Sequence, residues 1–150
     1  ETVKGRVDDA VSKGARVLVG GEAEGPNYQA TLLADVPEDS EFARVETFGP
    51  VAAIEIVDGA DEAVARANAT PYGLAAGIIT SDPDKGLALA QRIQSGIVHI
   101  NDQPIGDEPQ MPFGGVKDSG WGRFGGRAAM DEFTELRWIT VQSGTHPFPF

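Results

Sequence analysis

The sequence predicts an α/β fold, because short apolar runs alternate with segments of helical periodicity along most of the chain. Residues 51–57 and 74–80 have the composition of buried strands, and residues 97–101 form a third such run. Segments with helical spacing separate these runs. We therefore expect two consecutive β-α-β units, with parallel strands and right-handed crossovers.

The residues before these units predict a helix followed by two short strands. Val3, Val7 and Val11 recur every four residues, which places them on one face of a helix. An apolar run from Ala15 to Val19 follows and predicts a strand. Ala30 to Ala34 is the second candidate strand of this region.

The helices that link the later strands have clear start and stop signals. One is expected up to about Asn68, where Pro71-Tyr72-Gly73 ends it. The next begins at Ser81-Asp82-Pro83, because proline at the first helical position loses no hydrogen bond. Gly96 is expected to stop that helix before the third strand.

The amino-acid composition of the chain changes after Asn101. Residues 102–127 are rich in Gly, Pro and polar residues and are longer than an ordinary connection, which is typical of a functional loop. A short helix is predicted from about Ala128 to Phe133. Leu136 to Gln142 then alternates between two faces, as a strand does, and such a late strand can pair with something outside the core.

Composition excludes several classes of partner and site. The 150 residues carry 12 Lys and Arg against 23 Asp and Glu, and a net charge of −11 repels nucleic acid and anionic membranes. No cysteine is present, so these residues contain no thiol nucleophile or disulfide. His99 and His146 lie far apart without clustered carboxylates, and we expect no metal site. A cytoplasmic setting without a membrane span is expected, and Glu1 in place of Met suggests a start partway through a longer chain.

Gly120-Trp121-Gly122-Arg123-Phe124-Gly125 matches the dinucleotide-binding pattern G-x-G-x-x-G in letters but not in context. The motif needs a preceding apolar strand, and Pro112-Phe113-Gly114-Gly115 stands there instead. We interpret these residues as structural glycines of a tight loop.

Glu46-Thr47-Phe48-Gly49-Pro50-Val51 places an acid and an aromatic ring two residues apart before a strand. One hypothesis is a solvated Glu46 and a core Phe48. The other is functional: the carboxylate accepts hydrogen bonds from ribose hydroxyls, and the ring packs beside a flat cofactor ring. The residue types alone leave both hypotheses open.

Four motifs, taken in order, resemble the C-terminal portion of the NAD(P)-dependent aldehyde dehydrogenase superfamily. They are Glu46 to Val51, Ala67 to Gly77, Gly96 to Asn101 and Pro112 to Gly120. Within that superfamily the chain looks most like the benzaldehyde, salicylaldehyde and vanillin dehydrogenases. The residues that carry this narrower resemblance are Asn101 to Pro104, Asp107 to Phe113 and Gly122 to Gly126.

The resemblance implies a known chemistry. A cysteine thiolate adds to the aldehyde, hydride passes to the nicotinamide of NAD or NADP, and water assisted by a glutamate releases the acid. In the family, the nucleophile, the usual base and the dinucleotide-binding sheet lie upstream of the segment present here. The chain by itself is therefore expected to be inactive.

The resemblance also implies roles for single residues. Glu46 would hold the nicotinamide ribose and Phe48 would wall the nicotinamide, while Asn101, Ile105 and Phe113 would belong to the aldehyde channel. Phe124 departs from the many relatives that have Glu at this position, so a proton relay there is in doubt. No catalytic residue is assigned within the segment.

Residues 1–135 are thus expected to form the C-terminal part of a catalytic domain, and residues 136–150 an oligomerisation strand and tail. The segment from Trp138 to Val141 resembles the strand by which family members add to a neighbouring subunit's sheet, which implies a homo-oligomer. The alternative is a non-catalytic truncated relative that binds or assembles without turnover. Small aldehydes are the expected substrates, and neither nucleic acid nor membrane is an expected partner.

Overall fold

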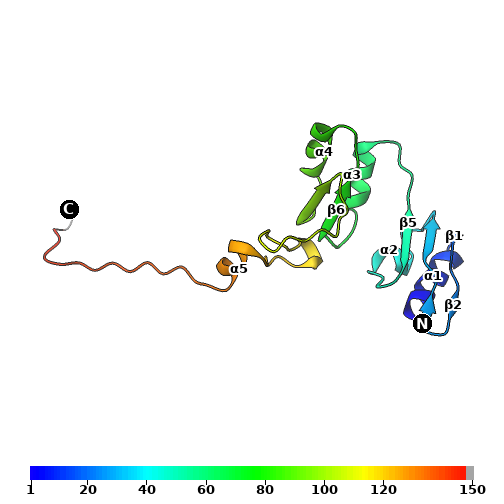
Figure 1. The fold of residues 1–150 in the computed structure, drawn as a ribbon, viewed down its shortest axis with the longest axis horizontal. Coiled ribbons are helices and arrows are strands. Elements are labelled where there is room, and N and C mark those ends of the chain that lie inside the picture. The colour runs from blue at the N-terminus through cyan, green and yellow to red at the C-terminus, as the bar shows by residue number, and fades with distance from the viewer. Residues whose placement is uncertain (148–150) are drawn as a thin grey trace.

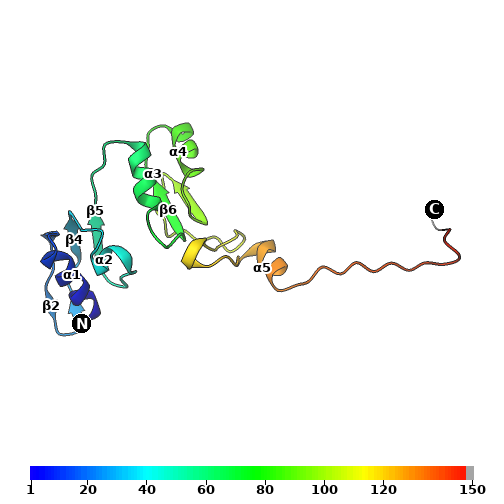
Figure 2. The ribbon, with the colours of Figure 1, turned by 180° about the vertical axis from the view of Figure 1, so that it is seen from behind.

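The computed structural model of the chain describes residues 1–147 and confirms mixed α/β content (Figure 1). The helices are α1 (Thr2–Ser12), α2 (Glu41–Arg44), α3 (Ala60–Asn68), α4 (Pro83–Ala90), a 3-10 turn (Lys117–Ser119) and α5 (Gly126–Glu132). The strands are β1 (Arg16–Val19), β2 (Ala23–Glu24), β3 (Asn27–Tyr28), β4 (Thr31–Ala34), β5 (Val51–Ile54), β6 (Ala75–Ile78) and β7 (Ile97–Ile100). The body ends in a long extended tail, which is also seen from behind in Figure 2.

The N-terminal region packs α1 against a three-stranded sheet of order β1-β4-β5. Val7 and Ala10 from α1 are buried against Leu33 of β4, and this cluster is the hydrophobic core. Val7 lies in the core as predicted, but Val11 is exposed and Ala10 takes the expected inward position. The helix and strands predicted from residues 3–34 are confirmed.

The predicted pairing of β5 with β6 is wrong. β5 pairs in parallel with β4, with Thr31 opposite Val51, and β6 belongs to a separate two-stranded sheet with β7. Strand β5 also ends at Ile54, earlier than predicted, and residues 55–59 lead the chain away from the first sheet to α3 (Figure 1). An apolar run predicts a strand but does not specify its neighbour, so periodicity missed the β4-α2-β5 crossover. The predicted burial is also wrong for β5 and β6, since only Val51 of β5, and Ala76 and Ile78 of β6, are half-buried.

The second predicted unit, β6-α4-β7, is confirmed. Its strands are parallel, with Gly77 opposite His99. Pro83 is the first residue of α4, and the carboxylate of Asp82 caps the helix by accepting a hydrogen bond of 3.0 Å from the Lys85 backbone N–H. The helix ends at Ala90, before the expected stop at Gly96.

Several short elements were not predicted: β2, β3, α2 and the 3-10 turn. The polar residues before β4 form the small β2–β3 hairpin, in which Gly25 has a φ of 59° that suits glycine. Helix α2 is one turn long and begins after Ser40, whose hydroxyl accepts a hydrogen bond from the Ala43 N–H. Elements this short contain too few residues to show a period.

The predicted loop at residues 102–127 and the short helix after it are confirmed, with α5 beginning at Gly126. The segment from Leu136 to Gln142 is extended and pairs with no strand among residues 1–147. Because its expected partner lies outside the core, the late strand stays a prediction. Trp138 is 91% exposed, and the tail runs away from the body in both views (Figures 1 and 2). Alternating residues create a strand only where a second backbone supplies hydrogen bonds.

Within residues 1–147, no helix has both the length and the apolar character needed to cross a membrane.

Candidate cofactor and substrate site

The segment from Glu46 to Pro50 is anchored on α1 by Arg6. One guanidinium nitrogen donates a short hydrogen bond to the carbonyl oxygen of Glu46 and reaches the Thr47 hydroxyl at 3.4 Å. The Arg6 Nε donates to the Glu41 carboxylate at 3.2 Å. Because the Arg6 side chain is mostly buried, its hydrogen bonds fix the backbone that carries Glu46.

Gly49 and Pro50 complete this anchor. A Cβ at Gly49 would lie 2.6 Å from a methyl group of Val3, so only glycine lets the segment lie this close to α1. The Pro50 carbonyl accepts a hydrogen bond of 2.8 Å from the Thr31 N–H at the start of β4. The chain then enters β5 at Val51 in register with that strand.

This anchoring leaves the side chains of Glu46 and Phe48 free. Among residues 1–147 the Glu46 carboxylate makes no hydrogen bond or ion pair within the chain, and its side chain is exposed. The Phe48 ring is 84% exposed, so the hypothesis that it belongs to the core is wrong. An acid without a partner and an uncovered ring can both accept contacts from another molecule.

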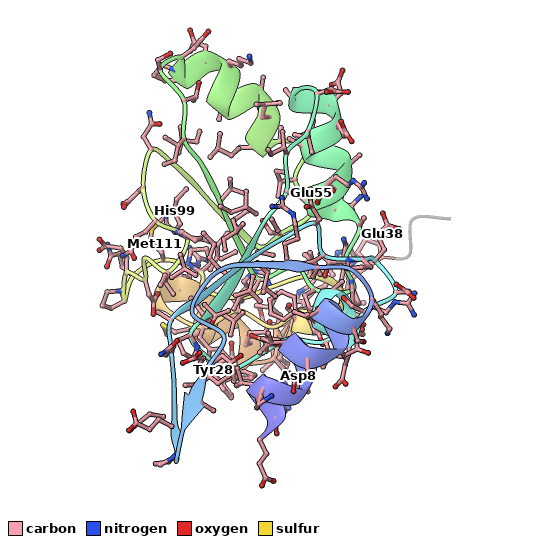
Figure 3. The ribbon with its side chains drawn as sticks, turned by 90° about the vertical axis from the view of Figure 1, so that its right-hand side faces the viewer. Asp8, Tyr28, Glu38, Glu55, His99 and Met111 are labelled. Carbon is pink, nitrogen blue, oxygen red and sulfur yellow. The ribbon has the colours of Figure 1, made fainter. Side chains whose placement is uncertain are left out.

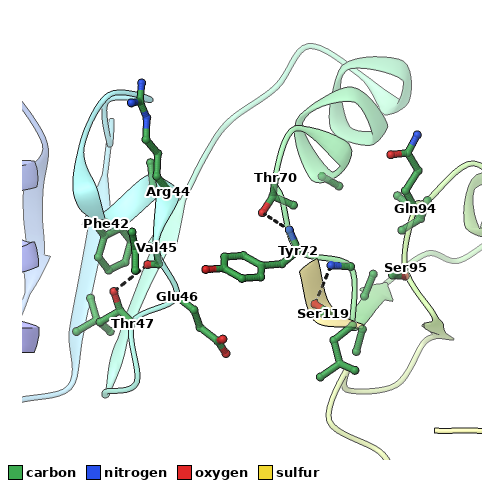
Figure 4. A pocket seen from close by; sticks show the side chains of 18 residues that line it. Phe42, Arg44, Val45, Glu46, Thr47, Thr70, Tyr72, Gln94, Ser95 and Ser119 are labelled. Carbon is green, nitrogen blue, oxygen red and sulfur yellow. Dashed lines mark hydrogen bonds between the residues drawn. The ribbon is translucent and has the colours of Figure 1, made fainter. Parts of the chain in front are cut away.

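Glu46 lines a cavity of about 390 Å³ between the Val45–Thr47 segment and the turn before β6. Figure 4 shows Tyr72 extending from that turn toward the segment that carries Val45 and Glu46. The opposite wall consists of residues from the 67–76 and 93–95 segments together with Ser119. The cavity thus joins three of the sequence motifs that carry the family resemblance.

Three of those motifs meet at a group of close backbone contacts that we call the glycine junction, made of Gly73, Gly96, Gly114 and Gly115. The Gly73 carbonyl accepts hydrogen bonds from the Gly96 N–H at 3.0 Å and the Val116 N–H at 2.9 Å. The Gly73 N–H donates to the Ser119 hydroxyl at 3.0 Å. A Cβ at Gly96 would overlap the Gly114 carbonyl, so these glycines are required by close packing.

Lys117 and Asn68 hold the same region together through side chains. The Lys117 ammonium donates to the carbonyl oxygens of Asn68 at 2.8 Å and Thr70 at 3.1 Å. The Asn68 amide bridges to the segment after α4, donating to the Arg92 carbonyl and accepting from the Gln94 N–H. These polar contacts set the position of the cavity wall that contains Thr70 and Gln94.

The predicted substrate residues are divided between the two ends of β7: Asn101 and Ile105 follow its last residue, whereas Phe113 precedes Gly114 of the glycine junction. Asn101 has a φ of 60°, and its side-chain oxygen accepts a hydrogen bond of 2.8 Å from the Thr80 N–H after β6. Ile105 is 83% exposed in the loop that follows. Phe113 is half-buried and forms an antiparallel bridge with Phe124.

The structure does not bring all five predicted site residues into one cavity. Glu46 lines the cavity described above, whereas Phe48, Asn101, Ile105 and Phe113 line neither it nor a second cavity of about 980 Å³. Within residues 1–147, no group of three or more His, Asp or Glu side chains is arranged to hold a metal ion.

The interpretation of the G-x-G-x-x-G letters as structural glycines is confirmed for Gly120 and Gly125, which both have a φ of 89°, but not for Gly122, where a Cβ would meet only ordinary contacts. A Cβ at Gly125 would overlap the Met111 carbonyl, and one at Gly114 would overlap the Gly122 carbonyl. Phe124 has a structural role between them: its backbone pairs with Phe113, and its ring lies 6.3 Å, centroid to centroid, from that of Phe133 in α5.

Charged groups around the second cavity are mutually paired. Arg66 in α3 forms ion pairs with Glu38 and with Glu55, the latter at 2.9 Å, and the pKa of Arg66 is raised mainly by its hydrogen bond with Glu38. Figure 3 labels both acids on the side of the molecule where α3 lies. This pairing gives those acids a structural role that Glu46 lacks.

Sequence reasoning missed several residues that build the first cavity, among them Arg6 and Tyr72. Arg6 has no distinguishing sequence signal, because its partners are on a distant segment. Tyr72 and Ser119 belong to the motifs Ala67 to Gly77 and Pro112 to Gly120, and this membership is the sequence signal that could have identified them as cavity residues.

The arrangement of these motifs can be compared with known proteins. The model of the aldehyde dehydrogenase family matches residues 1–139. The chain belongs to the aldehyde dehydrogenase family. It is 48% identical to vanillin dehydrogenase of Pseudomonas fluorescens over 98% of this chain and 30% of that protein. It is 47% identical to benzaldehyde dehydrogenase [NAD(+)] of Pseudomonas putida over 96% of this chain and 30% of that protein.

A solved structure agrees with this membership. Salicylaldehyde dehydrogenase from Pseudomonas putida G7, complexed with salicylaldehyde, matches 99% of this chain with a TM-score of 0.93 and 41% identity. The match covers 31% of that protein. This aldehyde dehydrogenase chain therefore spans about a third of the length of the relatives that it matches.

Proposed function

We propose that this chain forms the C-terminal part of the catalytic domain of an aldehyde dehydrogenase that oxidises an aromatic aldehyde to its acid with NAD or NADP. The names of the matched relatives support an aromatic substrate, since they act on vanillin, benzaldehyde and salicylaldehyde. The name of the benzaldehyde dehydrogenase also specifies NAD(+).

The observation that carries the proposal is the free Glu46 carboxylate at the edge of the cavity. A ribose diol needs an acceptor without a competing partner, and Glu46 makes no side-chain hydrogen bond or ion pair within residues 1–147. The exposed Phe48 ring offers an apolar surface of the kind that a nicotinamide ring covers. Both residue types therefore fit the cofactor that the family uses.

In the proposed enzyme, the bound cofactor supplies the acceptor for hydride. The residues of this chain hold and orient the reactants. Glu46 accepts hydrogen bonds from the ribose, Phe48 shields the nicotinamide from water, and Ile105 and Phe113 form apolar walls for the aldehyde ring. Asn101 fixes the start of the loop that carries Ile105 through its bond to Thr80.

We also propose that the thiol nucleophile comes from polypeptide outside these 150 residues, because the sequence contains no cysteine. The isolated chain should then produce no NAD(P)H from any aldehyde. The proposed enzyme is cytoplasmic. It assembles as a homo-oligomer through the Trp138 to Val141 segment, whose exposed alternating residues suit addition to another subunit's sheet.

A segment exchange tests the proposal directly. These 150 residues would replace the matching third of Pseudomonas putida salicylaldehyde dehydrogenase, and NAD- or NADP-dependent oxidation of three aromatic aldehydes would be followed by absorbance. We expect activity in the chimera and none in the isolated chain. A folded, assembled chimera without activity would instead favour the non-catalytic module, and activity in the isolated chain would contradict the missing nucleophile.

Within that active chimera, we expect Glu46→Gln to lower kcat/KM by roughly ten- to a hundredfold, because a loosened ribose misplaces the nicotinamide. The melting temperature should stay the same, since Glu46 makes no side-chain contact that stabilises the fold. Glu22→Gln, another exposed acid, is the matched control. Unchanged kinetics in Glu46→Gln would remove the cofactor role from this residue.

A further inference from the structure

The side chain of His99 is not used by the proposed mechanism, although it lies beside the substrate loop. His99 is in the middle of β7, directly opposite Gly77 of β6 in the parallel register. Its imidazole is largely buried, and the Nε2 atom is fully shielded from solvent. His99 is also labelled in Figure 3.

The loop from Asp102 to Gly106 folds back over this part of the sheet. A Cβ at Gly77 would lie 3.3 Å from the Asp102 carbonyl oxygen and 3.4 Å from the Pro104 ring. The loop therefore rests on the side of β6 where Gly77 has no side chain.

The other end of the loop rests on His99. A Cβ at Gly106 would lie 3.4 Å from Cε1 and 3.5 Å from Nε2 of the imidazole, which is ordinary van der Waals distance, so Gly106 lies next to the ring. Ile105, a proposed wall of the aldehyde channel, immediately precedes this contact. The bond from Asn101 to Thr80 fixes where the loop begins, and His99 supports where it returns.

The shielded Nε2 has no hydrogen-bond partner among the described residues. Buried polar atoms are normally paired, and this nitrogen is an exception. Because Nε2 makes no hydrogen bond to the loop, hydrogen bonding by the imidazole does not hold the loop in place. The ring atoms nearest to a Cβ at Gly106 are Cε1 and Nε2, on one edge of the imidazole, so the support of the loop depends on the volume and shape of the ring.

We propose that His99 is a positioning residue: its ring supports the Asp102–Gly106 loop and thereby sets the place of Ile105 against the aldehyde. This inference rests on the proposed function and adds a determinant of substrate selection to it. Loss of the ring lets the loop sink toward the sheet and draws the channel wall away from the substrate. A flat ring of similar size keeps the wall in place without any nitrogen.

The test compares His99→Ala with His99→Phe in the chimera. We expect His99→Ala to raise KM for benzaldehyde about tenfold, with kcat changed less than about threefold and the KM of the cofactor unchanged. His99→Phe should retain the parent values, because it keeps the ring. Should His99→Ala fail to fold, His99→Leu is the second variant, with an intermediate rise in KM expected.

A size exchange adds an independent check. Gly106→Val places a branched side chain against the imidazole and should raise the aldehyde KM. In the double variant His99→Ala, Gly106→Val, the aldehyde KM should return part of the way to the parent value. Additive effects of the two changes would contradict a direct contact.

Hydrogen exchange of the 150-residue chain separates this inference from the proposed function. The amides of Asp102, Gln103, Ile105 and Gly106 should exchange faster in His99→Ala than in the parent chain, and at the parent rate in His99→Phe. An inactive parent chimera would count against the proposed function, while the exchange rates would still test the support of the loop. Two results would overturn the positioning role. One is that His99→Phe loses affinity only for aldehydes that carry a hydroxyl group, and the other is that His99→Ala changes neither the aldehyde KM nor the exchange rates of the loop amides.

Discussion

Residues 1–54 and residues 60–133 are built from helices and strands of similar length, yet they are held together differently. The first region contains five of the six buried hydrophobic residues of the described chain, and the second contains the remaining one, Val64. The five are Val7, Ala10, Ala15, Leu33 and Ala34. Apolar burial therefore stabilises the first region more than the second.

The second region depends on backbone contacts instead. The glycine junction joins the turn before β6, the start of β7 and the long loop through the hydrogen bonds of Gly73. Apolar side chains such as Ile79 and Leu87 remain exposed elsewhere in this second region. Exposed apolar surface of this kind is what we expect where the remaining polypeptide of the proposed enzyme packs. The comparison suggests that the first region is the more stable of the two.

The largest expected effect comes from Leu33→Ala, because Leu33 is 0% exposed at the centre of the only hydrophobic core cluster described within residues 1–147. The free energy of unfolding should fall by about 2–5 kcal/mol. Urea denaturation followed by circular dichroism measures it. Leu136→Ala, the same change at a fully exposed tail position, should alter stability by less than about 0.5 kcal/mol. Similar losses in both variants would refute the assignment of the core.

Gly96→Ala should have the next largest effect, confined to the second region. The added methyl group overlaps the Gly114 carbonyl, and relieving that overlap should cost about 1–3 kcal/mol. We expect faster hydrogen exchange at the Val116 N–H, with residues 1–54 unaffected. Gly5→Ala, a helical glycine with open space around it, should be neutral or slightly stabilising. Unchanged protection in Gly96→Ala would show that the junction is not closely packed.

The helix caps are expected to contribute about equally to the stability of the two regions. A difference in stability between the regions would then come from the hydrophobic core. Ser40→Ala removes the cap of α2 and Asp82→Ala removes the cap of α4, and each should cost about 1 kcal/mol. Thermal unfolding measures both. Asp82→Asn is the matched control and should be nearly neutral, because asparagine caps helices equally well. A much larger cost at Asp82 would mean that caps dominate the second region.

The smallest expected effect depends on pH. The Glu41 backbone N–H, and then Lys13, lower the pKa of Asp9 below its ordinary value of 3.8. A lowered pKa means that ionised Asp9 stabilises the fold above that ordinary value, and that the contribution disappears as the pH falls through the lowered pKa. Asp9→Asn should therefore lower the melting temperature slightly at pH 7 and not in strong acid. The exposed Asp107 supplies the control, and a difference that persists in acid would exclude ionisation as the cause.

Much of the local structure could be predicted from the sequence. Asp82 and Pro83 predict the start of α4, the apolar runs predict β1, β4, β6 and β7, and the composition of residues 102–127 predicts a long loop. Partner choice could not be predicted. The pairing of β5 with β4, and the lack of a partner for Leu136 to Gln142 among residues 1–147, depend on which backbones lie nearby in space.

The same distinction, between what the sequence predicts and what only contacts in space decide, applies to the candidate site. The motif order predicts aldehyde dehydrogenase family membership and draws attention to Glu46 and Phe48. The anchoring of their segment by Arg6 and the contact between Gly106 and His99 involve residues that no local pattern connects.

By itself, the sequence determined the fold class, most of the elements and the family, because these follow from residue types that lie close together along the chain. The tertiary structure decided which strands pair, which glycines must be glycine and that the Glu46 carboxylate has no partner among residues 1–147. Those properties depend on contacts between distant segments, and a side chain's neighbours are set only when the chain has folded.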